Sequence, residues 1–237
     1  MKGMILAAGF GTRLAPLTDT IPKALVDVGG RPMIVHAINA LLRAGCTELV
    51  VNAHHHAEAV ADHFRTHTCG VPVHVVHESD ILGTGGGILH ARAWLDGDEP
   101  FFVHNADIVT TADLAALHRT CTRSGALAAL LVQPRATHRA LCFDAGMHLL
   151  GKEVWRADGA SYPDDALRMA FCGIHVISPR LFECAAFDGF ADIFDVYRPL
   201  LAMGERIIGH VYDGPFHDLG SVEKIARYVA GINDSQL

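Results

Sequence analysis

A glycine turn followed by two basic residues near the start of the chain could bind a polyphosphate. Gly9 and Gly11 allow a tight turn and let backbone N–H groups approach a phosphate closely. Thr12 adds a hydroxyl donor. Arg13 then offers a planar guanidinium, and Lys23, ten residues later, a compact positive charge. This pattern predicts a phosphate-binding loop.

The loop follows the apolar run Met4–Ala8, which predicts a buried parallel strand. Open α/β sheets bind ligands at the carboxyl ends of such strands. The loop is not a Walker sequence, and it lacks the third glycine of the dinucleotide fingerprint. The residues that we expect at the nucleotide are the end of this strand and the loop, namely Leu6, Ala7, Ala8, Gly9, Gly11, Thr12, Arg13 and Lys23.

Two aspartates could act at the same edge of the sheet. Asp107 comes soon after the apolar run Phe101–Val103, whose carboxyl end would deliver it there. Asp218 lies in the segment Phe216–Ser221, between a predicted strand and a predicted helix. Either aspartate could instead cap a helix or a turn, so the pattern alone leaves both roles open.

Predicted strands and helices alternate over the first 130 residues, which indicates an α/β fold with a doubly wound, mostly parallel sheet and right-handed connections. In this part we expect strands at 4–8, 49–51, 71–76, 101–103 and 126–132 and helices at 32–44, 56–64, 85–94 and 112–123. Beyond Pro134, short strands at 141–143, 148–150 and 169–177 predict a small antiparallel subdomain over the sheet. The remaining expected elements are helices at 181–186, 193–203 and 222–229 and a strand at 207–211.

The composition excludes several classes of partner. A net charge of −7 without a lysine–arginine cluster argues against nucleic acid or an anionic membrane surface. No apolar run approaches the roughly 18 residues that cross a bilayer, and no leader precedes the first strand, so we expect a cytoplasmic protein, monomeric or a small homo-oligomer. The six scattered cysteines predict reduced thiols. The tract His54–His56 favours a surface role over a zinc site.

The opening string as a whole is far more specific than its glycines. LAAG-x-G-T-R-L-x-P-L-T, followed by P-K-A-L, resembles the signature of the sugar nucleotidyltransferases, which join a nucleoside triphosphate to a sugar 1-phosphate. The resemblance extends from Met4 to about Val229. It implies a Rossmann-like nucleotidyltransferase fold, similar to that of GT-A glycosyltransferases, in one domain at 1–232. Within it, residues 1–133 would bind the nucleotide. Residues 134–232 would bind the sugar and supply the second metal ligand, and residues 233–237 would form a frayed tail.

The resemblance also assigns roles to the aspartates and the cations. The segment H-N-A-D is similar to the family's N-x-D, which implies that Asp107 binds Mg²⁺ beside Asn105. The string D-L-G-S implies a second metal ligand at Asp218, although a phenylalanine stands where the family has tryptophan. Arg13 would act on the pyrophosphate side and Lys23 at the α-phosphate or the incoming phosphate, so Arg13, Lys23 and Asp107 are the expected catalytic residues.

Contacts to the nucleoside and the sugar are expected at other segments. L-G-T-G-G-G at 82–87 resembles the form found in small uridylyl- and guanylyltransferases, which implies that Gly83 and Thr84 lie at the nucleoside, with Glu78 nearby. The family's E-E-K-P stretch is absent, and Lys152 in G-K-E-V-W is the nearest substitute. Gly173 resembles the glycine that leaves room for the sugar ring, or it marks a bulge in a core strand. The second strand ends at the predicted sugar contacts, Asn52 and His54.

These residues imply transfer of a nucleoside monophosphate to a sugar 1-phosphate, with in-line attack on the α-phosphate and Mg²⁺ as cofactor. The expected pairs are UTP with N-acetylmuramate or another amino-sugar 1-phosphate, or GTP with mannose or heptose 1-phosphate. Three alternatives stay open: a cytidylyltransferase acting on a non-sugar phosphate such as phosphocholine, a non-catalytic nucleotide-sugar-binding regulator, and a glycosyltransferase.

Overall fold

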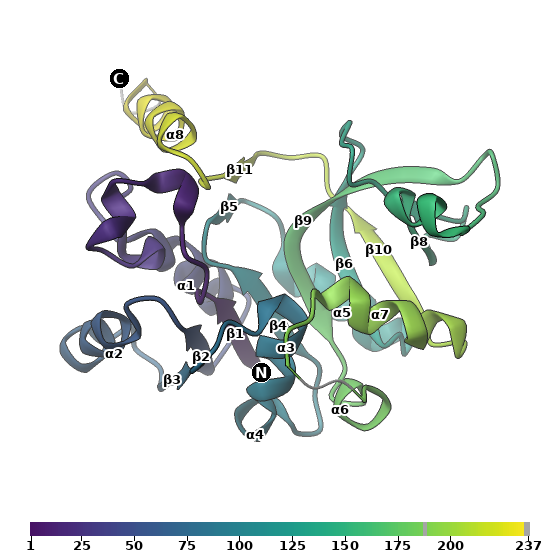
Figure 1. Cartoon of the computed structure of the whole chain (residues 1–237), viewed down its shortest axis with the longest axis horizontal. Coiled ribbons are helices and arrows are strands. Elements are labelled where there is room, and N and C mark those ends of the chain that lie inside the picture. The colour runs from purple at the N-terminus through teal and green to yellow at the C-terminus, as the bar shows by residue number, and fades with distance from the viewer. Residues whose placement is uncertain (187–188, 235–237) are drawn as a thin grey trace.

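A central sheet with helices on both faces organises the computed structural model, which describes residues 1–186 and 189–234 (Figure 1). The strands run in the order β10-β6-β9-β4-β1-β2-β3. Their bounds are β1 Lys2–Leu6, β2 Glu48–Ala53, β3 Val73–His77, β4 Phe101–Asn105, β6 Ala128–Gln133, β9 Leu167–Ile177 and β10 Ile207–Val211. Strands β1 to β4 are parallel neighbours, β10 is parallel to β6, and β9 is antiparallel to β4 and β6. The expected doubly wound, mostly parallel fold is therefore confirmed.

The helices form two layers because successive strand residues face opposite sides of the sheet. Ile5 and Phe102 pack in one hydrophobic cluster, whereas their neighbours Met4 and Phe101 pack in the other. The first cluster takes in helices α1 Met33–Arg43, α2 Ala57–Thr66 and α5 Leu114–Ser124. The second takes in α3 Gly83–His90, α4 Arg92–Leu95, α6 Leu181–Cys184 and α7 Ile193–Ala202. No described helix is long and apolar enough to cross a membrane.

The predicted antiparallel subdomain is only partly right. Strands β7 Leu141–Phe143 and β8 Leu149–Lys152 pair with each other, and β7 also pairs with the first part of β9. The rest of β9 lies inside the central sheet, between β4 and β6. A strand of eleven residues is long enough to serve both pairings. The segment expected to lie over the sheet is therefore one of its buried strands.

Other bounds also differ from the prediction. The first strand ends at Leu6, because the Ala7 N–H donates to the Asn52 side chain at 2.8 Å and leaves the strand ladder. The single helix expected at 85–94 is two helices, α3 and α4. The final helix, α8 Val222–Asp234, includes the first two residues of the predicted tail, and 235–237 lie outside the described residues.

Two short strands have no counterpart in the prediction. Strand β5 Ile108–Thr110 pairs antiparallel with β11 Phe216–Asp218. Each has three residues, too few for an alternating pattern to be recognised. Helix α8 follows β11 and packs on a small cluster next to the opening loop (Figure 1), which consists of Leu14, Val26, Val28, Met33 and Leu219. The short 3₁₀ helices of the chain are Thr12–Leu14, Leu17–Asp19, Lys23–Leu25 and Glu153–Asp158.

Candidate active site

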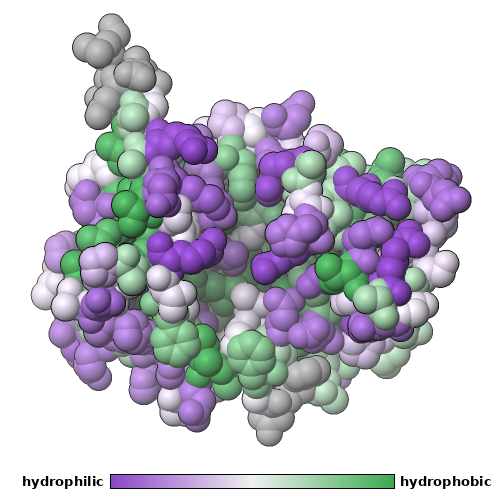
Figure 2. All heavy atoms as spheres, turned by 45° about the horizontal axis from the view of Figure 1, so that its top comes forward, coloured by the Kyte–Doolittle hydropathy of each residue, from purple (hydrophilic) through white to green (hydrophobic). Residues whose placement is uncertain are grey.

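Two adjoining cavities lie at the carboxyl ends of β1 and β4. The larger measures about 950 Å³ and the smaller about 240 Å³. Both are lined by Leu6, Thr84, Asn105 and Asp107. In the space-filling view the molecule is hollowed near its centre, and hydrophilic side chains surround the hollow (Figure 2). This arrangement could hold two ligands side by side, with Asp107 where they meet.

The opening loop folds back on itself at Gly11. This glycine has a φ of +68°, and a Cβ there would lie 2.8 Å from Thr18 Cγ2 and 3.0 Å from Lys23 Cβ. The Thr18 hydroxyl donates to the Gly11 carbonyl at 3.0 Å. A side chain at 11 would therefore push away the segment that carries Lys23. Gly11 and Thr12 shape the loop, and neither lines a cavity.

The Lys23 ammonium forms an ion pair with the Asp107 carboxylate, and both side chains are largely buried. Lys23 lines the smaller cavity together with the strand end Leu6–Gly9, whereas Arg13 lines the larger one. The two cations of the predicted loop therefore face different cavities on either side of Asp107.

Asp218 lies at the end of β11 and accepts two hydrogen bonds. Lys224 Nζ donates to Oδ2 at 2.6 Å, and the Gly220 N–H donates to Oδ1 at 2.8 Å. Burial works to raise the pKa of Asp218, but these two bonds and the charges of Lys224 and Arg13 together lower the pKa below its ordinary value. A Cβ on Gly220 would lie 2.7 Å from Arg13 Nη2. Arg13 therefore adjoins Asp218.

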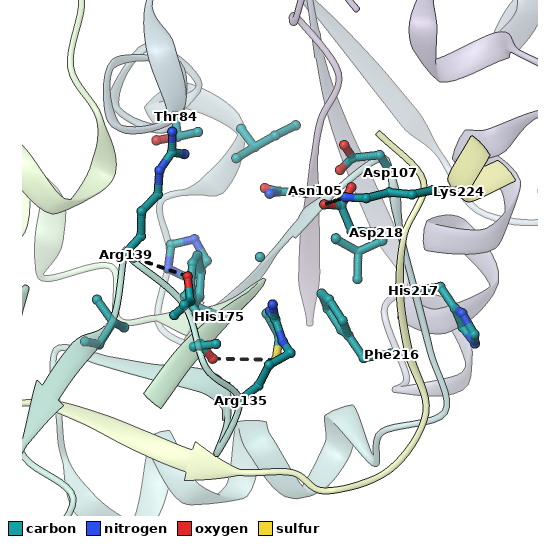
Figure 3. A pocket seen from close by; sticks show the side chains of 18 of the residues that line it. Thr84, Asn105, Asp107, Arg135, Arg139, His175, Phe216, His217, Asp218 and Lys224 are labelled. Atoms are coloured by element: carbon teal, nitrogen blue, oxygen red, sulfur yellow. Dashed lines mark hydrogen bonds and ion pairs between the residues drawn. The ribbon is translucent and has the colours of Figure 1, made fainter. Parts of the chain in front are cut away.

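The donor set suits a hard cation. In Figure 3, Asp107 and Asp218 lie close together, and Lys224 lies next to them. Within residues 1–186 and 189–234, no three side chains of His, Cys, Asp or Glu gather to hold a metal. Mg²⁺ is commonly bound by one or two carboxylates together with substrate phosphates and waters. Asp107 and Asp218 fit that pattern.

Asn52 and Glu78 form a buried brace under the smaller cavity. The Asn52 amide donates to Glu78 Oε1 at 2.7 Å, and Glu78 Oε2 accepts from the Leu82 N–H at 3.0 Å. With the Ala7 bond described above, the pair joins the end of β1 to the start of α3. Asn52 lines the smaller cavity, and its contact with a sugar remains a prediction, whereas Glu78 lines neither cavity.

The glycines of α3 allow close packing against residues 189–192. A Cβ on Gly83, whose φ is +71°, would lie 2.5 Å from the Ala191 carbonyl oxygen, and one on Gly86 would lie 2.4 Å from the Gly189 oxygen. The N–H of Gly85 donates to the Ala191 carbonyl. Protein groups thus occupy the start of this helix. Gly83 and Thr84 still line the smaller cavity, and their contact with a nucleoside remains a prediction.

Gly173 lies in the bulge of β9, where the pairing register with β6 shifts. Its φ is +70°, and a Cβ would lie 2.7 Å from Asn105 Nδ2. The missing side chain therefore makes room for Asn105, and both residues line the larger cavity. The bulge that the sequence left as one of two possibilities is present, and contact with a sugar at Gly173 remains a prediction.

Lys152 also lines the larger cavity, but it has partners. Its Nζ lies 3.8 Å from Asp192 Oδ1 and 4.8 Å from the centre of the Phe194 ring. His175 lines the same cavity with Nδ1 2.9 Å from the Tyr197 hydroxyl. Burial lowers the pKa of His175 to about 3, so it is neutral at physiological pH.

The histidine tract supports the loop. His54 Nδ1 lies 2.9 Å from the Glu78 carbonyl oxygen, and the His54 ring packs edge-on against Phe10. His55 Nε2 lies 3.3 Å from the Thr18 carbonyl oxygen. His54 lines neither of the two cavities but contacts the loop, and the predicted sugar contact stays a prediction.

Four basic residues of the larger cavity escaped the sequence reasoning: Arg135, Arg139, Lys224 and Arg227. The first two lie on the loop after β6 and the others on α8. They are far from the opening loop in sequence and follow no common spacing, so no motif pointed to them. Proximity in the folded chain is their only common feature.

The sequence is similar to those of known nucleotidyltransferases. Residues 2–141 match the family model described as nucleotidyl transferase. A mannose-1-phosphate guanyltransferase of Schizosaccharomyces pombe is 39% identical over 139 residues, which cover 56% of this chain and 38% of that protein. A probable mannose-1-phosphate guanylyltransferase 1 of Oryza sativa subsp. japonica is 39% identical over 136 residues, with the same coverage. The chain thus spans about two fifths of the length of these relatives.

Solved structures show the same fold. An apo UDP-glucose pyrophosphorylase superposes with a TM-score of 0.80 at 21% identity, over 100% of this chain and 99% of that chain. HddC from Yersinia pseudotuberculosis, complexed with GMP-PN, superposes with a TM-score of 0.78 at 20% identity, over 98% and 99%.

Proposed function

Because the chain belongs to the nucleotidyl transferase family, we propose that it transfers a nucleoside monophosphate from a nucleoside triphosphate to a sugar 1-phosphate and releases pyrophosphate. The observation that carries this proposal is the pair of adjoining cavities with Asp107 at their junction. One cavity would hold the nucleotide and the other the sugar phosphate, so that the reacting phosphates meet beside the two aspartates.

The charge of the cavity walls supports two polyanionic ligands. The whole chain has a net charge of −7, yet seven basic side chains and only three aspartates line the cavities. The basic residues are Arg13, Lys23, Arg135, Arg139, Lys152, Lys224 and Arg227. A triphosphate has about four negative charges and a sugar phosphate about two. Local positive charge of this size suits both together.

In this mechanism an ionised oxygen of the sugar phosphate attacks the α-phosphorus. The bond to the β-phosphate oxygen breaks, and its electron pair leaves with pyrophosphate. No proton has to be removed, which agrees with the neutral, buried His175 in the lining of the larger cavity. Arg13 and Lys23 hold the phosphates and stabilise the charge that develops on them. Asp107 and Asp218 would hold Mg²⁺, which supplies further charge neutralisation when bound.

The lining residues also support the proposed division of the chain. The smaller cavity is lined only by residues between Leu6 and Asp107, which lie in the proposed nucleotide-binding part. Residues after 133 line only the larger cavity, on the proposed sugar side. Asp218 and α8 return to the opening loop and complete the site. Use of a nucleoside triphosphate supports action in the cytoplasm.

Among substrate pairs, GTP with mannose 1-phosphate has direct support, because the two relatives described above are mannose-1-phosphate guanyltransferases by name. UTP with N-acetylmuramate 1-phosphate or another amino-sugar 1-phosphate is the second pair, and the T-G-G-G form at 84–87 is compatible with either pair.

The test is pyrophosphate release from the purified protein with Mg²⁺, over a grid of four nucleoside triphosphates against sugar 1-phosphates and phosphocholine. We expect release that requires one triphosphate and one sugar 1-phosphate together. Release that occurs only with CTP and phosphocholine, and with none of the sugar 1-phosphates, would establish the cytidylyltransferase alternative. Nucleotide-sugar binding without release from any pair would instead indicate a regulatory homologue.

A further inference from the structure

The basic residues of the cavities fall into two groups. Each of the three lysines is paired with an aspartate: Lys23 with Asp107, Lys152 with Asp192 and Lys224 with Asp218. In the part of the chain that the structure describes, none of the four arginines has an ion pair. These arginines are Arg13, Arg135, Arg139 and Arg227. Each lysine charge therefore has a carboxylate partner within the protein. Among the arginines, within the described residues, only Arg13 lies near a carboxylate, that of Asp218.

The difference between the paired lysines and the arginines helps to identify the residue that binds the acceptor phosphate. Lys152 was the sequence-based candidate, yet its Nζ lies 3.8 Å from Asp192 Oδ1 and the Phe194 ring lies beside its ammonium group. The Lys152 pair differs from the Lys23 pair, because Asp107 would bind Mg²⁺ in the proposed reaction whereas no metal is proposed for Asp192. Asp192 would therefore keep its charge and repel a phosphate bound at Lys152. Its geometry suits the positioning of α7 against β8 better than ligand binding.

Arg139 has neither restriction. Its backbone N–H donates to Thr137 Oγ1 at 3.2 Å, which shapes the loop, while the guanidinium has no hydrogen-bond partner among the described residues. In Figure 3 the side chain of Arg139 extends toward Thr84, a residue that lines both cavities, while Asp107 and Asp218 lie on the other side of the view. Arg139 therefore extends from the proposed sugar part toward the boundary between the two cavities.

The loop that carries Arg139 is anchored on both sides. Gln133 Nε2 donates to the Gly214 carbonyl at 2.9 Å, which ties the start of the loop to the segment between β10 and β11. At the other end, the Glu153 N–H donates to the Ala140 carbonyl at 2.8 Å, and β7 begins at the next residue. Both ends of the loop are therefore held, and Arg139 is the residue directly before the second anchor, Ala140.

We propose that Arg139, and not Lys152, binds the phosphate group of the acceptor. A guanidinium presents a planar fork that can donate two hydrogen bonds to one phosphate, whereas an ammonium group is a point charge. The assignment rests on the proposed function, since it names the residue that recognises the sugar 1-phosphate in that reaction. It also explains how the site can work without the E-E-K-P stretch.

The experiment compares Arg139→Gln, Arg139→Lys and Lys152→Gln with Arg123→Gln, an exposed arginine on α5 outside both cavities. The KM for the sugar 1-phosphate and the KM for the triphosphate are measured for each variant. Loss of a charged hydrogen bond at Arg139 should raise the KM for the sugar phosphate about tenfold or more and leave the KM for the triphosphate within about twofold. Arg139→Lys should recover part of the loss, and Lys152→Gln should have the smaller effect.

A binding titration separates this inference from the proposed function. Mannose 1-phosphate and glucose 1-phosphate are titrated into each variant by calorimetry, with free mannose as the ligand that lacks the phosphate. Weaker binding of the sugar phosphates to Arg139→Gln supports the inference even if no pair in the grid is turned over. Unchanged binding to Arg139→Gln, a larger loss in Lys152→Gln, or no binding to the unmodified protein would each overturn it, whether or not turnover is observed.

Discussion

Asp218 is held beside Asp107 by backbone pairing between two strands that lie more than 100 residues apart in the sequence. The register of β5 and β11 places Asp218 opposite Ile108, and the Leu219 N–H donates to the Asp107 carbonyl at 2.8 Å. The main chain therefore sets the relative position of the two carboxylates. Each carboxylate is paired with a lysine in this structure, Asp107 with Lys23 and Asp218 with Lys224.

Asp107→Asn should abolish metal-dependent turnover while the protein stays folded. The amide keeps the shape of the side chain but loses the charge that attracts Mg²⁺ and pairs with Lys23. We expect turnover to fall at least about a hundredfold, because the loss of several kcal/mol of charge stabilisation in the transition state slows a reaction by at least that factor. Steady-state pyrophosphate release measures it, with the exposed Asp164→Asn as control. Full activity of Asp107→Asn would remove this residue from the site.

Lys23→Met should lower turnover roughly a hundredfold with little change in melting temperature. Methionine keeps the apolar stem, and Asp107 still faces an open cavity, so its carboxylate can be solvated once the lysine is gone. Turnover and thermal unfolding are measured on the same preparation. A large fall in melting temperature at normal turnover would show that Lys23 is structural instead.

Asn52→Ala should destabilise the protein by about 2 kcal/mol or more, because the Ala7 N–H and one oxygen of buried Glu78 lose their partner. The end of β1 should also loosen, which would raise the KM for the triphosphate. Urea unfolding tests the first effect. Asn39→Ala on α1, where no side-chain hydrogen bond is lost, should stay within about 0.5 kcal/mol of the unmodified protein. Equal effects of the two substitutions would argue against the brace.

Gly173→Ala should cost both stability and turnover. Its matched control is Gly70→Ala, because Gly70 also has a positive φ, +88°, but a Cβ there meets nothing within 4 Å. Both variants carry the left-handed strain of about 1 kcal/mol. Only the Gly173 variant also collides with Asn105, which lines both cavities. Unfolding and turnover assays should separate them, and similar behaviour would show that the contact with Asn105 is not critical.

The contribution of Asp218 to stability should disappear in acid. Its pKa in the folded protein lies below the ordinary carboxyl value of about 3.9, so the charged form stabilises the fold. That stability is fully present above the unfolded-state pKa and is lost as the pH falls through the folded-state pKa. The melting temperatures of the unmodified protein and Asp218→Asn should therefore differ at pH 6 and converge below about pH 4. A difference that persists in stronger acid would contradict the assignment.

The local parts of the site could be read from the sequence. The apolar run before Gly9 and the alternation of strands and helices indicated the fold and the edge of the sheet where a ligand would bind, because both are short-range patterns. Asp107 was placed by the same reasoning, since it comes just after a buried strand. Even so, the pattern put the end of β1 two residues too late, because a side chain 45 positions away captures the Ala7 N–H.

What the tertiary structure alone decided is how the second half of the chain completes the site. Three-residue strands such as β5 and β11 have no periodicity, so their pairing and the approach of Asp218 to Asp107 could not be read locally. The insertion of β9 between β4 and β6 depends on partners at least 37 residues away. The basic lining is likewise a property of the fold. An acidic chain with no cluster of lysine and arginine in its sequence gathers seven of them around two cavities, because loops and a terminal helix that are remote along the chain converge on one edge of the sheet.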